Sequence, residues 1–284
     1  MTNPDFVLSL SCPDRRGIVA EVTRFLFERN CNILDSQQFG DRAIGRFFMR
    51  MHGQSEGGAE ISRLKADFAA IGEKFGMEAE FFDSSRKTRG VIMVSKFGHA
   101  LVDLLYRVRI GAIRMDVPLI VSNHGDFQDV AAAQSIPFVH LPVSGQNKTE
   151  QEARLTALLD EHRIDLVVLA RYMQILSDGF CRPRLGRIIN IHHSFLPSFK
   201  GANPYTQAHD RGVKLIGATA HYVTGDLDEG PIIDQSVERV THALDASDYV
   251  AVGRDIENRT LARAVKWHCE NRILLNGKKT VIFS

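Results

Sequence analysis

The sequence predicts an α/β protein built from a small α+β domain followed by a doubly wound, mostly parallel sheet. The first part shows strand and helix patterns in the order strand, helix, strand, strand, helix, strand, which is the ferredoxin-like order. The second part alternates continuous apolar runs with helical stretches, a pattern typical of parallel strands that are covered on both faces. With 284 residues, the chain is long enough to form both domains.

The first domain, residues 1–84, opens with a strand over residues 6–10, which Pro13 and Asp14 end. Apolar side chains at helical spacing follow over residues 18–26. A second, clearly amphipathic helix covers residues 61–75, where apolar residues lie three and four apart. Three more strands complete the order, over residues 31–39, 46–52 and 77–81.

Residues 85–90 are polar and basic, so we interpret them as the linker to the second domain, residues 91–284. The apolar runs of this domain predict strands over residues 91–95, 117–122, 164–170, 187–192, 214–223 and 231–240. Helices are expected over residues 149–162 and 247–275, with a short final strand over residues 279–283. Ligands of such sheets bind outside the carboxyl ends of the strands, so polar residues at those ends are candidates for a site.

Composition excludes several classes of function. The formal net charge of +1 gives no bulk attraction to nucleic acid or to a membrane surface. No run approaches the ~18 apolar residues of a membrane span, and residues 6–10 are too few for a signal-peptide core. The four cysteines form no CxxC pair, which disfavours a disulfide framework or a zinc ribbon. We therefore expect a cytoplasmic protein with reduced thiols that binds neither nucleic acid nor membrane.

An apolar strand turns polar at its end in residues 188–197. Asn190 and His192 are two apart, so on a strand they point to the same face, whereas His193 is expected on the other face. An amide and an imidazole side by side can donate hydrogen bonds to a developing oxyanion. A strand that caps itself with polar residues at a turn would look the same, so this pair alone does not establish a site.

Two further segments carry polar residues next to predicted strands. Residues 221–231 place three acids, Asp226, Asp228 and Glu229, in a tight loop. A carboxylate in such a loop can act as a general base or order a water molecule, and a solvated acidic turn is the ordinary alternative. Residues 169–177 follow another strand and form either the wall of a pocket or an exposed loop.

Together, the motifs N-I-H-H-S-F-L-P-S-F-K-G-A-N-P-Y and H-Y-V-T-G-D-L-D-E-G-P-I-I resemble the folate-dependent formyltransferases over roughly residues 90–284. The resemblance implies that Asn190, His192 and Asp228 are catalytic, and that neither a metal nor a cofactor beyond the folate substrate is required. It also implies folate contacts after one strand and before the aspartate, with the residues Arg171, Tyr172, Met173, Gln174, Ile175, Leu176, His221, Val223, Thr224 and Gly225.

The start of the chain carries a resemblance of its own. Residues 10–19, L-S-C-P-D-R-R-G-I-V, resemble the beginning of an ACT domain, an amino-acid-binding regulatory module with the ferredoxin-like order. The resemblance implies an amino-acid effector, for which residues 14–17 are the candidate loop, although Asp14 is equally an ordinary helix N-cap. Because ACT modules commonly pair side by side, it also implies a homo-oligomer.

The formyl acceptor is inferred from the first strand of the second domain. Glycinamide ribonucleotide formyltransferase holds the phosphate of its acceptor with a glycine-rich turn after that strand. Residues 94–99 here, V-S-K-F-G-H, have one glycine and the bulky Phe97, although Lys96 could still meet an anion. Together with the ACT-like domain, this implies that water is the acceptor. The expected reaction is hydrolysis of 10-formyltetrahydrofolate to formate and tetrahydrofolate, which would supply formate for purine biosynthesis and balance one-carbon pools.

In this mechanism Asp228 orders the attacking water and helps remove its proton, directly or through His192, while Asn190 and His192 stabilise the oxyanion. Three alternatives stay open. The first is formyl transfer to an amine, and the second is a non-catalytic amino-acid sensor. The third is a metal-dependent hydrolase, which is disfavoured because no HExxH spacing occurs and because His192 and His193 should face apart. Its ligands would come from His192, His193, His209, His221 and Asp228.

Overall fold

The computed structural model describes residues 4–194 and 204–284, and its contacts divide the chain into two compact units. The first unit contains Met1–Lys87, Glu270–Asn276 and Thr280–Ser284, and the second contains Thr88–Cys269 and Gly277–Lys279. The end of the chain therefore returns to the first unit, whereas the sequence analysis assigned residues 91–284 to the second domain.

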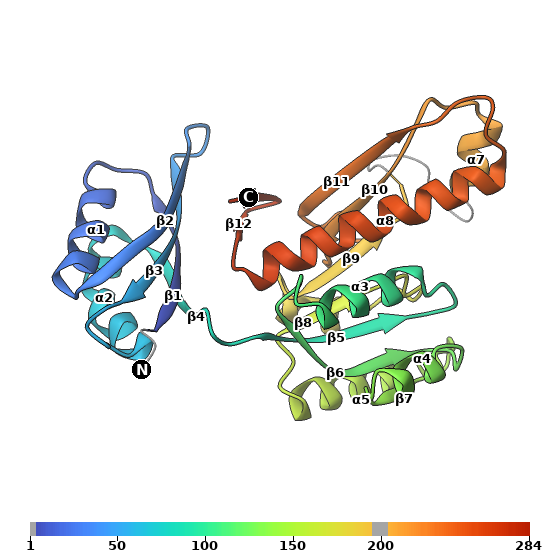
Figure 1. The fold of residues 1–284 in the computed structure, drawn as a ribbon, viewed down its shortest axis with the longest axis horizontal. Helices are drawn as coiled ribbons and strands as arrows, with labels where there is room; N and C mark the ends of the chain where they lie inside the picture. Colours follow the sequence, from blue (N-terminus) through green and yellow to red (C-terminus); the bar gives the residue numbers. More distant parts are fainter. Residues whose placement is uncertain (1–3, 195–203) are drawn as a thin grey trace. The chain divides into compact units, whose positions relative to one another are not determined.

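The first unit has the predicted ferredoxin-like order (Figure 1). Its elements are β1 (Asp5–Pro13), α1 (Ile18–Glu28), β2 (Cys31–Asp41), β3 (Arg46–Ser55), α2 (Ile61–Phe75) and β4 (Glu78–Asp83). The strands form an antiparallel sheet in the order β2-β3-β1-β4, and both helices lie on one face of it. The rings of Phe25 and Phe68 meet edge to face, with their centroids 5.0 Å apart, in the core between helices and sheet.

The helix predicted over residues 247–275 ends earlier, because α8 spans Ala246–Cys269. Asn271 has φ +52°, which stops the helix, and a hairpin of β12 (Ile273–Asn276) and β13 (Lys279–Ile282) follows. The buried Arg50 of β3 donates to the carbonyl oxygens of Glu270 and Asn271 at 3.0 and 3.1 Å. This anchoring depends on residues far apart in sequence, which explains why helical periodicity gave no sign of it.

The second unit is a seven-stranded, mostly parallel sheet, as the sequence predicted. Its strands are β5 (Thr88–Val94), β6 (Met115–Ser122), β7 (Phe138–His140), β8 (Leu166–Leu169), β9 (Ile188–His192), β10 (Leu215–Tyr222) and β11 (Ile232–Arg239). Its helices are α3 (His99–Arg109), α4 (Gln128–Ala133), α5 (Lys148–Glu161), α6 (Asp178–Cys181), α7 (Pro204–Asp210) and α8, with a 3-10 turn at Arg182–Arg184. The order is β11-β10-β9-β8-β5-β6-β7, and β10 alone is reversed, since it pairs antiparallel with both β9 and β11 while the other pairs are parallel.

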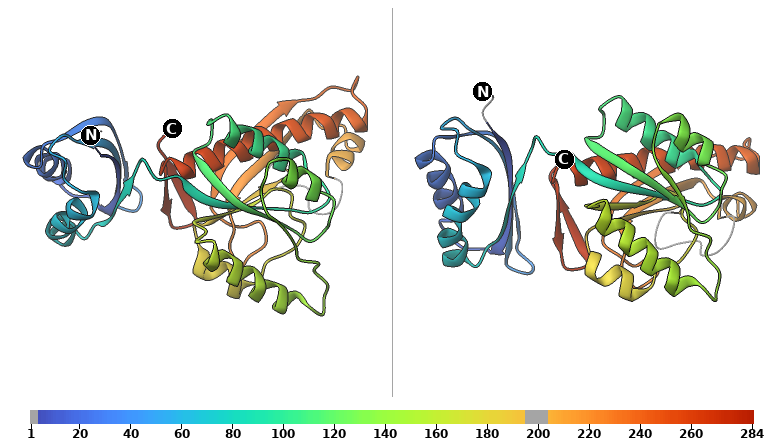
Figure 2. Two further views of the ribbon diagram at one scale, coloured as in Figure 1. Left: turned by 60° about the horizontal axis from the view of Figure 1, so that its bottom comes forward. Right: turned by 90° about the horizontal axis from the view of Figure 1, so that it is seen from below.

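Helices cover both faces of this sheet, with α3 and α8 on one face and α5 on the other (Figure 2). The chain winds outward from β5 to β7 and then crosses back to β8 on the other side of β5. Ligands bind at the carboxyl ends of the strands where the winding reverses in this way, so the region beyond β5 and β8 is the place to look for a site.

The strand β5 starts at Thr88, within the residues interpreted as a linker. The backbone N–H of Arg89 donates to Asp165 Oδ2 at 2.9 Å, and its side-chain Nε donates to the His162 carbonyl at 2.9 Å. Polar anchors rather than apolar periodicity hold this end of the strand, so the sequence pattern did not reveal it. Among the helices that the structure describes, none is long and apolar enough to cross a membrane.

Candidate active site

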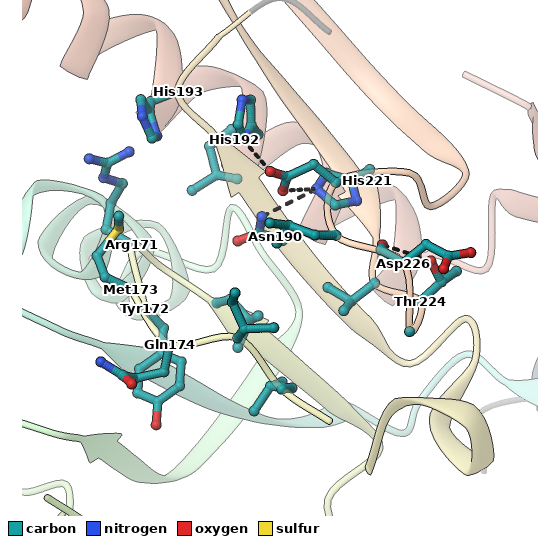
Figure 3. A pocket seen from close by; sticks show the side chains of 18 residues that line it. Arg171, Tyr172, Met173, Gln174, Asn190, His192, His193, His221, Thr224 and Asp226 are labelled. Atoms are coloured by element: carbon teal, nitrogen blue, oxygen red, sulfur yellow. Dashed lines mark hydrogen bonds and ion pairs between the residues drawn. The ribbon is translucent and has the colours of Figure 1, made fainter. Parts of the chain in front are cut away.

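A cavity of about 250 Å³ lies at the carboxyl ends of β8 and β9, where the loop between β10 and β11 closes it. Every residue predicted for the site lies on its lining (Figure 3). The lining comprises Leu169, Arg171, Tyr172, Met173, Gln174, Ile175, Leu176, Asn190, Ile191, His192, His193, His221, Val223, Thr224, Gly225, Asp226, Leu227 and Asp228. Residues 195–203, which continue the first motif, lie outside the described residues.

Strand pairing brings Asn190 and His221 together. β9 and β10 are antiparallel, and Asn190 stands directly opposite His221 in their register. Their side chains therefore leave the sheet on one face, where Asn190 Nδ2 lies 3.2 Å from His221 Nε2. The other ring nitrogen, Nδ1, lies 3.0 Å from the Tyr222 carbonyl oxygen and must carry a proton to bond it. His221 thus fixes the Asn190 amide at the edge of the cavity.

Asp228 reaches back from the loop after β10 and lies between two imidazoles. Its Oδ2 is 3.2 Å from His192 Nδ1, and its Oδ1 is 3.6 Å from His221 Nε2. Burial alone would raise the pKa of Asp228, but hydrogen bonding and positive charge from His192 and His221 lower it well below the ordinary value. The group is therefore a carboxylate that orients the His192 ring and lies beside His221.

The Asp228 contact fixes the orientation of His192. With Nδ1 directed at the carboxylate, Nε2 is left on the other side of the ring, buried and without a hydrogen-bond partner among the described residues. A buried, unpartnered nitrogen on a cavity wall is a candidate for proton transfer.

The expectation that His193 faces away from His192 is wrong. The rings of His192 and His193 are stacked, with their centroids 5.1 Å apart, and both line the cavity. Strand β9 ends at His192, so the alternation of faces along a strand no longer applies to the next residue. The opposite facing of the two rings therefore no longer argues against a metal site.

Other observations bear on that alternative. His209, a further member of the suggested ligand set, pairs with Asp210 at 3.2 Å and packs on Tyr249, away from the cavity lining. Among residues 4–194 and 204–284, no group of three or more His, Cys, Asp or Glu side chains is arranged to hold a metal ion.

The loop that carries Asp228 is shaped by close contacts at two glycines. Asp228 itself has φ +57°, which turns its side chain back toward β9. A Cβ at Gly230 would stand 1.7 Å from the Tyr222 carbonyl oxygen, and one at Gly225 would stand 2.2 Å from Asp178 Oδ1. The two glycines let the loop lie against neighbouring chain and so hold Asp228 in reach of the histidines.

The opposite wall of the cavity is formed by residues 171–176. Ser95, the residue after β5, holds this segment in place. Ser95 is buried, and its hydroxyl donates to Asn123 Oδ1 at 2.6 Å while it accepts from the Met173 N–H at 2.9 Å. The Ser95 N–H donates to the Arg171 carbonyl oxygen at 3.2 Å. The turn after the first strand of the sheet is thus engaged in supporting this wall.

Sequence reasoning missed a buried cluster behind this wall, centred on Glu257 of α8. Glu257 Oε2 lies 2.8 Å from His99 Nε2 and 3.4 Å from Arg171 Nε, and Oε1 accepts from the Tyr205 hydroxyl at 2.9 Å. Burial would raise the pKa of Glu257, but the His99 hydrogen bond and the Arg171 charge lower it. An acid on the buried face of a long helix was the signal that could have identified it.

Each of the two units matches a known protein family. The formyl transferase family matches residues 88–265, and the ACT domain family matches residues 6–68. The first range contains all the cavity residues, and the second runs from β1 to the first half of α2.

Relatives match along nearly the whole chain. A formyltetrahydrofolate deformylase of Corynebacterium sp. is 46% identical over 97% of this chain and 97% of its own length. One of Bacillus subtilis is 46% identical over 98% of this chain and 93% of its own.

Solved structures of deformylases match nearly the whole chain, whereas a transformylase structure matches a smaller part of it. The crystal structure of formyltetrahydrofolate deformylase from Burkholderia mallei has a TM-score of 0.95 and 48% identity, covering 99% of this chain and all of that one (100%). Glycinamide ribonucleotide transformylase 1 from Symbiobacterium toebii has a TM-score of 0.65 and 30% identity, covering 70% of this chain and 95% of that one.

Proposed function

The chain belongs to the formyl transferase family and, within it, to the formyltetrahydrofolate deformylases, and from that premise we propose that it hydrolyses 10-formyltetrahydrofolate to formate and tetrahydrofolate. One observation carries the chemistry, namely the Asp228 carboxylate held between the imidazoles of His192 and His221 beside the Asn190 amide. This arrangement can activate water and stabilise an oxyanion without further groups.

His192 is the base in the proposed reaction. Both oxygens of Asp228 face imidazole nitrogens, so the carboxylate is poorly placed to take a proton from water itself. The His192 Nδ1–H bonded to Asp228 leaves Nε2 as the acceptor, in the manner of a histidine oriented by an acid. Nε2 takes a proton from water as the oxygen attacks the formyl carbon, and Asp228 stabilises the imidazolium that forms.

Asn190 is the oxyanion donor. One N–H of its Nδ2 group is directed at His221 Nε2, so the second N–H can point into the cavity. Such a donor, preorganised at the oxygen of the tetrahedral intermediate, contributes about 3 kcal/mol to catalysis. His192 then returns its proton to the folate nitrogen as the carbon–nitrogen bond breaks. The atoms of water end up in formic acid and in the N–H of tetrahydrofolate, and formic acid releases its proton to give formate.

The walls of the cavity suit the folate. Tyr172 to Leu176 on one side and Val223 to Gly225 on the other present apolar side chains and main-chain groups. The Met173 N–H is already donated to Ser95, so neighbouring main-chain groups are the ones that meet the pterin. No cofactor beyond this substrate enters the mechanism.

Water rather than an amine is the proposed acceptor. The turn after β5 is packed against neighbouring residues. Gly98 lies against the Phe127 ring, where a Cβ would stand 2.1 Å away, and the Ser95 hydroxyl is hydrogen-bonded to Asn123 and Met173. Such a turn has little freedom to wrap a phosphorylated amine.

The experiment is formate release by the purified full-length protein from 10-formyltetrahydrofolate, with no amine present. We expect formate and tetrahydrofolate in equal amounts, and no acceleration when amines are added. A protein that forms formate only when an amine is supplied, or not at all, would contradict the proposal. An Asp228→Asn preparation, purified identically, controls for contaminating activity.

The first unit is proposed to bind an amino-acid effector near residues 14–17 and to pair with the same unit of a second copy, since the ACT family matches residues 6–68. We propose a cytoplasmic setting because all four cysteines are free thiols, three of them buried. Turnover measured with each amino acid in turn, together with the mass of the particle in solution, tests the effector and the oligomer.

A further inference from the structure

Two residues of the cavity have an unusual backbone. Of the described residues other than glycine, those with φ in the left-handed region are Asn30, Ser135, Arg163, Arg171, Asp228 and Asn271. Four of them stand two residues after the end of α1, α4, α5 or α8, where this conformation is an ordinary helix cap. Arg171 and Asp228 follow no helix, and both line the cavity. Strain that local structure does not explain points to function.

The side chain of Arg171 is buried but not satisfied. Only 11% of it is exposed, and its Nε and Nη1 have no hydrogen-bond partner among the described residues. Glu257 lies 3.4 Å from Nε, close enough to balance the charge, yet its oxygens accept instead from His99 and Tyr205. A guanidinium carries five N–H donors in a planar fork, and burying them unpaired is costly.

The guanidinium extends toward the His193 end of the cavity, on the wall facing Asn190 and His192 (Figure 3). Of the described residues on the lining, Arg171 is the one that is cationic at every working pH. Its charge and its unpaired donors suit a small anion, which a guanidinium binds through charge-assisted hydrogen bonds.

We propose that Arg171, held by Glu257, is the subsite that receives the formate carboxylate as it leaves the reaction centre. The inference rests on the proposed function, because hydrolysis generates this anion in the same cavity. Formate has the negative charge and the acceptor oxygens that these donors lack, and it is small enough to leave the folate in place. In this role Arg171 is a product-binding residue, and Glu257 is a positioning residue that acts through it.

Binding of formate to the free enzyme tests the subsite separately from turnover. Full-length protein without folate is titrated against ¹³C-formate, and the line width of the formate signal gives the dissociation constant. Arg171→Gly removes the guanidinium while suiting the local φ of +65°, so the variant should fold. Arg171→Asn is a second variant whose side chain tolerates the same backbone. Arg163→Gly is the matched control, an exposed arginine with φ +50° away from the cavity lining.

We expect both Arg171 variants to bind formate at least tenfold more weakly than the wild type, and Arg163→Gly to bind it within twofold. Added formate should also inhibit wild-type turnover more strongly than turnover of the Arg171 variants. Equal formate affinity in wild type and Arg171→Gly, or displacement of formate by an equal concentration of chloride, would overturn the subsite. A wild type that binds formate but releases none from 10-formyltetrahydrofolate would instead refute the proposed function.

Discussion

Replacing Asp228 by asparagine isolates the charge of this carboxylate. Asparagine has the same shape and tolerates the φ of +57°, so the loop should keep its conformation. What is lost is the negative charge beside His192 as that ring becomes an imidazolium. Over the 3.2 Å between Oδ2 and Nδ1, with an effective dielectric constant of ~20, the lost attraction is about 5 kcal/mol.

Five kcal/mol corresponds to about 10⁴-fold in rate. The same exchange of acid for amide in a serine protease triad costs about 10⁴-fold in kcat. The side chain of Asp228 is 24% exposed, and water screens part of the interaction, so we expect kcat to fall by about 10³- to 10⁴-fold. KM should change by less than about threefold, because the folate walls are untouched.

The assay is steady-state formate release at several concentrations of 10-formyltetrahydrofolate. Glu229→Gln is the matched control, since it removes one exposed negative charge from the same loop without a place on the cavity lining. It should stay within twofold of the wild type. If Asp228→Asn keeps more than a tenth of wild-type kcat, charge stabilisation of His192 is not the basis of catalysis.

Other predictions concern the loop, pH and metals. Gly230→Ala places a Cβ 1.7 Å from the Tyr222 carbonyl oxygen and should lower stability by more than about 3 kcal/mol in thermal melts, whereas Gly125→Ala meets open space and should be neutral. Burial lowers the pKa of His268 to about 4 from 6.5, so between these pH values the unfolded chain binds a proton that the folded chain does not bind. The free energy of unfolding should therefore fall as pH drops from 6.5 toward 4. The loss should be about 2 kcal/mol, less than the full shift implies because His268 keeps some contact with solvent. His268→Gln should flatten this pH dependence, whereas His242→Gln, at an exposed position, should leave it unchanged. Turnover should be unchanged by a chelator such as EDTA, and activity that returns only with added metal would contradict a metal-free mechanism.

The sequence was most informative where strand geometry alone decides position. Asn190 and His192 share a face because they are two apart on β9, and the structure has both on the cavity lining. The loop after β8 and the acidic loop before β11 lie on the same lining although β10 runs antiparallel to β9, so the two loops leave the sheet at opposite ends. Each motif alone had an ordinary structural explanation, and their convergence depended on the strand order β10-β9-β8, which no single motif contains.

The failures share a cause, which is dependence on contacts between distant segments. His193 was misplaced because the end of β9, one residue earlier, depends on its pairing with β10. Glu257 lies on the buried face of α8 with Ile256 and Leu261, and only its contacts with His99 and Tyr205 explain an acid there. The closing hairpin had a local sequence signal, the Asn276-Gly277 turn with Gly277 at φ +60°. The prediction followed the apolar periodicity instead and extended the helix to residue 275.

The two strained positions of the cavity follow from one constraint of this fold. The carboxyl ends of the strands offer few side chains, so further charged groups must come from the connecting loops, and a tight reversal brings them back over the sheet. Glycine makes such a reversal without strain but carries no functional group. A charged residue in the left-handed region costs about 1–3 kcal/mol and delivers a carboxylate at 228 and a guanidinium at 171. If this reasoning holds, Arg171→Gly should lose formate binding, while the relieved backbone strain offsets part of the stability that is lost when the buried Glu257 carboxylate loses its cationic partner. Arg171→Asn, which keeps a side chain on the same backbone, should therefore melt below Arg171→Gly in thermal melts.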